Sequence, residues 1–139
     1  MKKGFTLIEI LVVVTIIGLL AAVTSVTYSQ ISKQSRDAKR KTDLEQTRAA
    51  VEMYRSNNNS YPITISAGTS ICDPAGCPPT GNKYLNKVPT DPKYPTYTYY
   101  YSGSVSNYTL GAYLETGGTN CQAGCGGNCN YCLDAYGQK

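Results

Sequence analysis

Gly4-Phe5-Thr6-Leu7-Ile8-Glu9 opens a long apolar stretch, and this stretch decides how the chain is organised. From Ile10 to Ile31 the sequence contains no Asp, Glu, Lys or Arg. A helix that crosses a bilayer needs about 20 mainly apolar residues, so the stretch is long enough to span a membrane. Glu9 lies at its start, and an ionisable group in such a segment is costly, by roughly 2.5–3.5 kcal/mol at the helix centre on insertion scales. Glu9 is therefore predicted to be functional.

Two ordinary interpretations of this N-terminus are open. A cleaved secretory signal peptide would explain the basic start and the small residues at 21–25, but the apolar stretch is long for one and has Glu9 inside it. A plain membrane anchor would explain the length of the stretch, and it gives Glu9 no role.

A third interpretation rests on a resemblance. The basic leader followed by Gly4, Phe5 and then Glu9 resembles the processing motif of type IV pilins and type II secretion pseudopilins. The resemblance implies that a prepilin peptidase cleaves after Gly4 at the cytoplasmic face and N-methylates Phe5. The apolar helix would then stay on the mature protein.

The chemistry of this motif can be stated without the resemblance. Cleavage after Gly4 would give Phe5 a new α-amine, which is mostly cationic at neutral pH. Phe5 and Glu9 are four residues apart, a spacing that puts two side chains on one face of a helix. Glu9 could neutralise this amine or, as the resemblance implies for an assembly, the Phe5 amine of a neighbouring subunit. The alternative is that Glu9 merely lies at the level of the lipid headgroups.

The length of 139 residues predicts one small domain on a helical stalk. Leu44, Thr47, Val51 and Tyr54 form one helical stripe, and the Asn-rich run before Pro62 ends the helix. The expected parts are a leader (1–4), a membrane and filament-core helix (5–30), the amphipathic half of the same helix (31–56) and a β-rich head (57–139).

The head is predicted to be a small antiparallel sheet packed on the amphipathic stripe, which makes the fold class α+β and pilin-like. Residues 63–95 are expected to be a long loop with little regular structure. Residues 96–102 and 107–115 alternate and are rich in β-formers, which predicts a hairpin. Short matches at Tyr61-Pro62 and 88–92, among others, give the head a looser resemblance to the major, G-type pseudopilin.

Six cysteines in a small non-cytoplasmic head predict a disulfide framework. They are Cys72, Cys77, Cys121, Cys125, Cys129 and Cys132. The first two flank a short turn and are expected to pair, while the other four allow three connectivities. The rival is a zinc site formed by those four thiolates. The resemblance would also imply calcium in this C-terminal region, but Glu115 and Asp134 are its only acidic groups. We therefore expect no metal and no cofactor.

Five basic residues follow the apolar stretch on its C-terminal side, namely Lys33, Arg36, Lys39, Arg40 and Lys41. Counted alone, they would place the head in the cytoplasm by the positive-inside rule. The motif and the cysteines favour the opposite orientation. We expect a solvated helix face paired with the nearby acidic residues, with lipid headgroups or nucleic acid as the alternative partners.

The residues suggest no enzyme: the chain has no His, no phosphate-binding loop and no convincing carboxylate pair. Its thirteen tyrosines are expected to belong to a pleated, half-buried sheet rather than to a ligand platform. The predicted function is a structural filament subunit, most simply a secretion pseudopilin; a type IV or DNA-uptake pilin and a monomeric anchored binding protein are the alternatives.

The expected partners are copies of the chain, other pilin-like subunits, the prepilin peptidase, the inner-membrane assembly platform and membrane lipid. Nucleic acid is not expected as a partner, because loss of Lys2 and Lys3 leaves the chain near neutral. The expected location is the cytoplasmic membrane with the head outside, and a periplasmic or extracellular filament after assembly.

Overall fold

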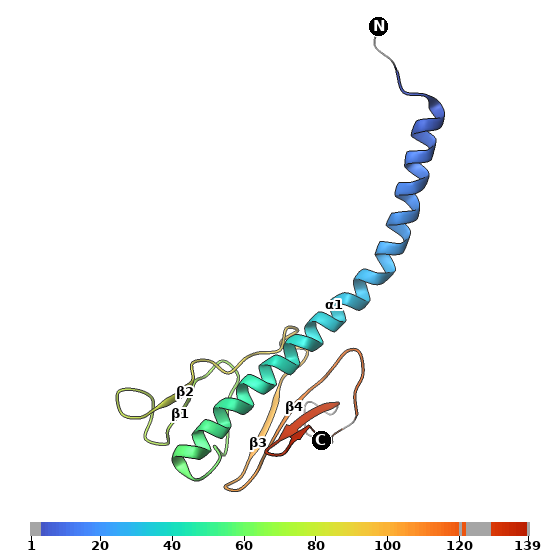
Figure 1. The fold of residues 1–139 in the computed structure, drawn as a ribbon. Helices are drawn as coiled ribbons and strands as arrows, with labels where there is room; N and C mark the ends of the chain where they lie inside the picture. Colours follow the sequence, from blue (N-terminus) through green and yellow to red (C-terminus); the bar gives the residue numbers. More distant parts are fainter. Residues whose placement is uncertain (1–3, 120, 122–128, 139) are drawn as a thin grey trace. The chain divides into compact units, whose positions relative to one another are not determined.

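A computed structural model describes residues 4–119, 121 and 129–138 (Figure 1). Its one helix among these residues is α1, Leu7–Asn58, of 52 residues. The strands are β1 (Ile71–Cys72), β2 (Lys83–Leu85), β3 (Tyr100–Gly103), β4 (Tyr108–Ala112), β5 (Tyr131–Asp134) and β6 (Gly137–Gln138). Two compact units divide the chain, Met1–Ser35 and Arg36–Lys139.

The first unit carries the apolar part of α1. By length and composition, α1 contains a stretch that could cross a membrane. Its large apolar side chains are exposed in the single chain, between 47% at Val12 and 82% at Leu7. Unburied apolar surface of this extent needs lipid or another subunit to cover it.

In the second unit, the amphipathic stripe of α1 forms one side of the core. Leu44, Thr47, Val51 and Tyr54 are all buried, which confirms the predicted stripe. Leu110 of β4 and Leu133 of β5 belong to the same hydrophobic cluster. The long helix and the antiparallel sheet together give the predicted α+β, pilin-like fold.

The helix ends two residues later than expected, at Asn58 rather than near Ser56. Asn59 follows with φ of 55°, and its N–H donates to the carbonyl of Arg55 at 2.8 Å. Asn tolerates this left-handed conformation, which satisfies one of the carbonyls that a helix end leaves unpaired.

The main sheet has four antiparallel strands in the order β3-β4-β5-β6. Leu110 pairs with Tyr101 on one side and with Leu133 on the other. The predicted hairpin is present, but its first strand starts at Tyr100 rather than at Thr96. The backbone N–H groups of Thr96 and Tyr97 instead donate to the carbonyl of Lys93, so this segment forms a turn.

The irregular regions of the head contain short strands. The segment 63–95 is mostly loop, as expected, and β1 and β2, of two and three residues, pair in antiparallel fashion within it. In the Cys-rich tail, all four residues of β5 are buried. Burial of β5 depends on pairing with β4, which the residues of the tail alone do not reveal.

Candidate functional site at the start of the helix

The bond between Gly4 and Phe5 lies outside α1. The space beside Gly4 is open, since a β-carbon on this residue would meet no other atom within 4 Å in the described part of the chain. The Phe5 side chain is 83% exposed. Non-helical, exposed backbone is where proteases cut most readily, so the geometry of the predicted cleavage residues is compatible with processing.

Glu9 takes part in a capping arrangement with Thr6. The carboxylate oxygen Oε2 of Glu9 accepts hydrogen bonds from the backbone N–H and the hydroxyl of Thr6, both at 2.8 Å. Thr6 immediately precedes α1, so the pair forms a capping box in which the third helical residue bonds back to the cap. The carboxylate is thereby satisfied within a single uncleaved chain.

In the uncleaved chain, Phe5 and Glu9 do not share one helix face. The helix begins only at Leu7, because Thr6 acts as its cap, so Phe5 precedes the helical geometry that the spacing argument assumes. Thr6 is the residue that sequence reasoning missed. Its signal was present, since Thr followed three residues later by Glu before an apolar run is the sequence signature of a capping box.

A buried cluster of ion pairs surrounds Arg40 in the second unit, where its side chain is 0% exposed. Its Nε and Nη2 donate to the two carboxylate oxygens of Asp91 at 2.7 and 3.0 Å. Its Nη1 donates to Asp37 at 2.8 Å and to Glu115 at 2.9 Å. One guanidinium therefore joins α1, the loop before β3 and the segment after β4.

Further donors complete this cluster. Arg36 donates two hydrogen bonds to Glu115, and Lys93 donates a third. The bonds from Arg36 hold the pKa of Glu115 well below its usual range, against the effect of burial, with Lys93 and Arg40 acting in the same direction. Burial would raise the pKa of Asp37, but bonds from Thr116, from backbone N–H groups and from Arg40 lower it.

These contacts correct part of the expectation of a solvated basic helix face paired with nearby acidic residues. Arg40 does pair with Asp37, as expected, but it is buried, and Arg36 pairs with Glu115 of the head. The partners Asp91 and Glu115 are far away in sequence, so spacing along the helix could not reveal them. The cluster therefore links α1 to two other segments inside the head.

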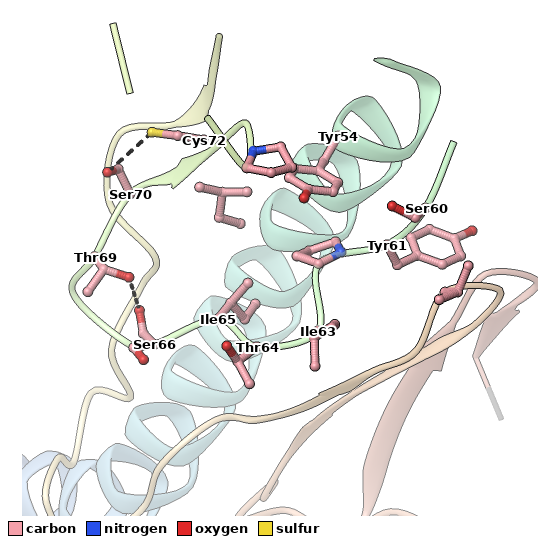
Figure 2. Close-up of a pocket in the computed structure, with 14 residues that line it drawn as sticks. Tyr54, Ser60, Tyr61, Ile63, Thr64, Ile65, Ser66, Thr69, Ser70 and Cys72 are labelled. Atoms are coloured by element: carbon pink, nitrogen blue, oxygen red, sulfur yellow. Dashed lines mark hydrogen bonds between the residues drawn. The ribbon is translucent and has the colours of Figure 1, made fainter. Parts of the chain in front are cut away.

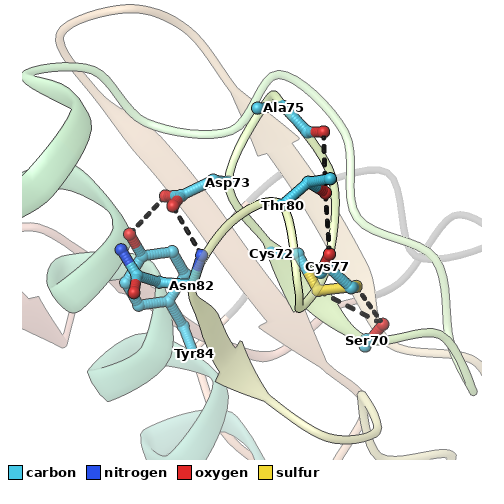
Figure 3. Close-up of a disulfide and its surroundings, with 8 residues drawn as sticks. All are labelled: Ser70, Cys72, Asp73, Ala75, Cys77, Thr80, Asn82 and Tyr84. Carbon is cyan, nitrogen blue, oxygen red and sulfur yellow. Dashed lines mark hydrogen bonds between the residues drawn. A yellow bond between two sulfur atoms is a disulfide. The ribbon is translucent and has the colours of Figure 1, made fainter.

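Two disulfides join described cysteines. Cys72 bonds to Cys77, the local pairing expected from the sequence, and Cys121 bonds to Cys132 (Figure 3 shows the first). Cys129 is buried, and Cys125 lies outside the described residues. No cysteine of the described part is free, and the same part contains no group of three or more residues that could hold a metal ion.

The first disulfide turn is tied to the end of α1 through Asp73. Its carboxylate accepts hydrogen bonds from the Tyr84 hydroxyl and from the Asn82 N–H at 2.7 Å (Figure 3). It also accepts one from Asn58 Nδ2 at 2.8 Å. The bond from Tyr84, followed by the other two, lowers the pKa of Asp73 to about 2. Asn58 is the last residue of α1, so the turn is anchored to the helix.

An open hollow of about 510 Å³ lies beside the end of α1 (Figure 2). Tyr54 and residues 60–66 line part of it, and residues 69–72, Pro74 and Val105 line the rest. Its lining includes no Asp, Glu, His, Lys or Arg. The hollow thus offers no charged acid or base for catalysis.

An N-terminal cap with one carboxylate, an exposed apolar helix and a small sheet packed on the second half of that helix together define a pilin-like filament subunit. Comparison with known proteins agrees. Residues 1–25 match the prokaryotic N-terminal methylation motif, and residues 27–128 match protein G of the type II secretion system. The chain belongs to the type II secretion system protein G family, a family of pseudopilin structural subunits not known as enzymes.

Its relatives include proteins named type II secretion system core protein G. That of Pseudomonas aeruginosa is 35% identical and is aligned over 90% of this chain and 94% of the relative. That of Vibrio cholerae is 30% identical over 84% and 85%, and that of Escherichia coli K12 is 32% identical over 66% of each. These relatives favour the secretion interpretation over the pilus alternatives. No solved structure matches the chain.

Proposed function

We propose that the mature chain begins at Phe5, with a methylated α-amine, after a prepilin peptidase removes residues 1–4. Residues 5–30 would anchor the subunit in the cytoplasmic membrane and later form the filament core. Residues 31–56 continue the helix into the head, and residues 57–139 complete the head outside the cytoplasm. The observation that carries the proposal is an exposed, non-helical Gly4-Phe5 bond directly before an apolar helix with one carboxylate.

Glu9 would act at the assembly step. In the uncleaved chain its carboxylate is satisfied by the backbone and hydroxyl of Thr6. In a filament core, the cationic Phe5 amine of a neighbouring subunit offers a stronger, opposite-charge partner for the same oxygens. The low dielectric of packed apolar helices strengthens that attraction. The other partners would be further pilin-like subunits and the inner-membrane assembly platform.

Replacing Glu9 tests this role. Glu9→Leu removes a polar group from the apolar segment, so the amount of subunit in the membrane fraction should stay the same or rise. Filament yield should fall strongly, because the neighbouring amine loses its counter-charge. Glu45→Leu is the matched control, since Glu45 is an exposed carboxylate of the head. Normal filament yield from Glu9→Leu would show that the pairing is wrong.

A further inference from the structure

Two acidic residues of α1 near the start of the head, Asp37 and Asp43, face inward. Asp37 accepts hydrogen bonds from Arg40, from the Glu115 N–H and from both the N–H and the hydroxyl of Thr116. Asp43 is buried and accepts a hydrogen bond from the Tyr99 hydroxyl at 2.8 Å. Both carboxylates are therefore committed to the interior of the head and do not neutralise the lysines beside them.

Lys39 and Lys41 remain on the outside. Both are exposed, and neither forms an ion pair within the part of the chain that the structure describes. They lie about 100° to either side of Arg40 around the helix axis, so they flank the buried stripe. The Nζ of Lys41 also lies 5.5 Å from the centre of the Tyr131 ring. This stretch of α1 thus presents two cations without an acidic partner among the described residues.

These lysines come soon after the apolar stretch in the chain. At 1.5 Å per residue, Lys39 follows Ile31 by about 12 Å of helix and Lys41 by about 15 Å. A lysine side chain can extend its ammonium group back toward the headgroups. Anionic headgroups attract basic residues within about a Debye length, roughly 8 Å in physiological salt. With its side chain extended in that direction, Lys39 can bring its ammonium group within range of the headgroups, and Lys41 can do so at the edge of that range.

We propose that Lys39 and Lys41 bind anionic phospholipid headgroups on the outer surface of the membrane that holds the unassembled subunit. This inference rests on the proposed membrane insertion of α1. Lipid is favoured over nucleic acid because the two cations adjoin the apolar stretch. The same geometry explains how a basic cluster can lie outside the cytoplasm: Arg36 and Arg40 are neutralised by the head.

Lysine labelling of the full chain tests the proposal. The wild-type protein would be placed in nanodiscs of phosphatidylcholine alone or of phosphatidylcholine with phosphatidylglycerol. Acylation of each lysine would be followed by mass spectrometry. Lys39 and Lys41 should be labelled about fivefold more slowly in the anionic discs, and high salt should remove the difference. Lys83 and Lys87 are the internal controls, because they are exposed but lie in and just after β2.

Three results would overturn the proposal. Equal labelling of Lys39 and Lys41 in both discs would show that no headgroup contact exists. Equal slowing of Lys83 and Lys87 would show general adsorption of a basic protein. Protection of Lys39 and Lys41 by duplex DNA in neutral discs, matching that by anionic lipid, would identify a nucleic-acid surface instead. A chain that does not enter the discs at all would contradict the proposed function itself, and this inference with it.

Discussion

Arg40→Met removes the centre of the buried ion-pair cluster while keeping much of the side-chain volume. Asp91 would lose both bonds that the guanidinium makes to its carboxylate, at 2.7 and 3.0 Å, and would keep the Lys93 N–H at 2.7 Å. Asp37 and Glu115 would each lose one bond and keep other donors. The variant therefore leaves one poorly compensated carboxylate, that of Asp91, which is only 5% exposed.

Breaking a buried ion pair by removing one partner costs about 3–5 kcal/mol. A domain of this kind is stable by about 5–15 kcal/mol, so the loss is a large fraction of the total. Arg36→Met is the matched control, because Arg36 is 25% exposed and its partner Glu115 keeps Arg40 and Lys93. Solvent screens a partly exposed pair of this kind, so its loss costs much less than the loss of a buried pair.

Urea unfolding of the full chain in detergent micelles would measure both variants. Near-ultraviolet circular dichroism of the tyrosines reports on the head, which holds most of the thirteen tyrosines of the chain. We expect Arg40→Met to lower the free energy of unfolding by about 3–5 kcal/mol and Arg36→Met to lower it by clearly less, because Arg36 is partly exposed. Equal, small changes in the free energy of unfolding for the two variants would refute the view that this cluster stabilises the head.

Two further predictions concern the same unit. Folding lowers the pKa values of Glu115 and Asp37. Their contribution to the free energy of unfolding is therefore full above their unfolded pKa values of roughly 4, and it is lost as the pH falls through their folded pKa values. In unfolding experiments from pH 6 downward, the free energy of unfolding should stay constant to about pH 5 and fall steeply below about pH 4. Replacing both cysteines of the Cys121–Cys132 disulfide by serine should lower the free energy of unfolding by about 3 kcal/mol in the same assay, against about 2 kcal/mol for the Cys72–Cys77 disulfide. The difference is expected because Cys121–Cys132 closes the longer loop. An equal or reversed order would contradict the loop-length argument.

The features that sequence could predict are local ones. The apolar stretch, the stripe through Leu44 and Val51, and the Asn-rich helix end all depend on residues close together in the chain. The Cys72–Cys77 pair could be predicted for the same reason, since its two cysteines flank one turn. Thr6 was equally local, and the capping-box pattern with Glu9 could have identified it.

The features that sequence could not predict are contacts between distant segments. Arg40 bonds to Asp91 and Glu115, which lie 51 and 75 residues away in the sequence. The residues next to Arg40 in the helix could not reveal these partners, so the sequence predicted a solvated face. The pairing of Cys121 with Cys132 was one of several connectivities that spacing leaves open. Burial of β5 follows from its register with β4, which only the folded sheet reveals.

The intact mass of the mature protein tests the central claim most directly. Protein would be purified from membranes of cells with the prepilin peptidase and of matched cells without it. The account predicts a chain that begins at Phe5 and carries a methyl group on its α-amine, and an uncut chain from Met1 when the peptidase is missing. A mature chain that begins at Met1 in the normal cells, or after Ala22, would contradict the account.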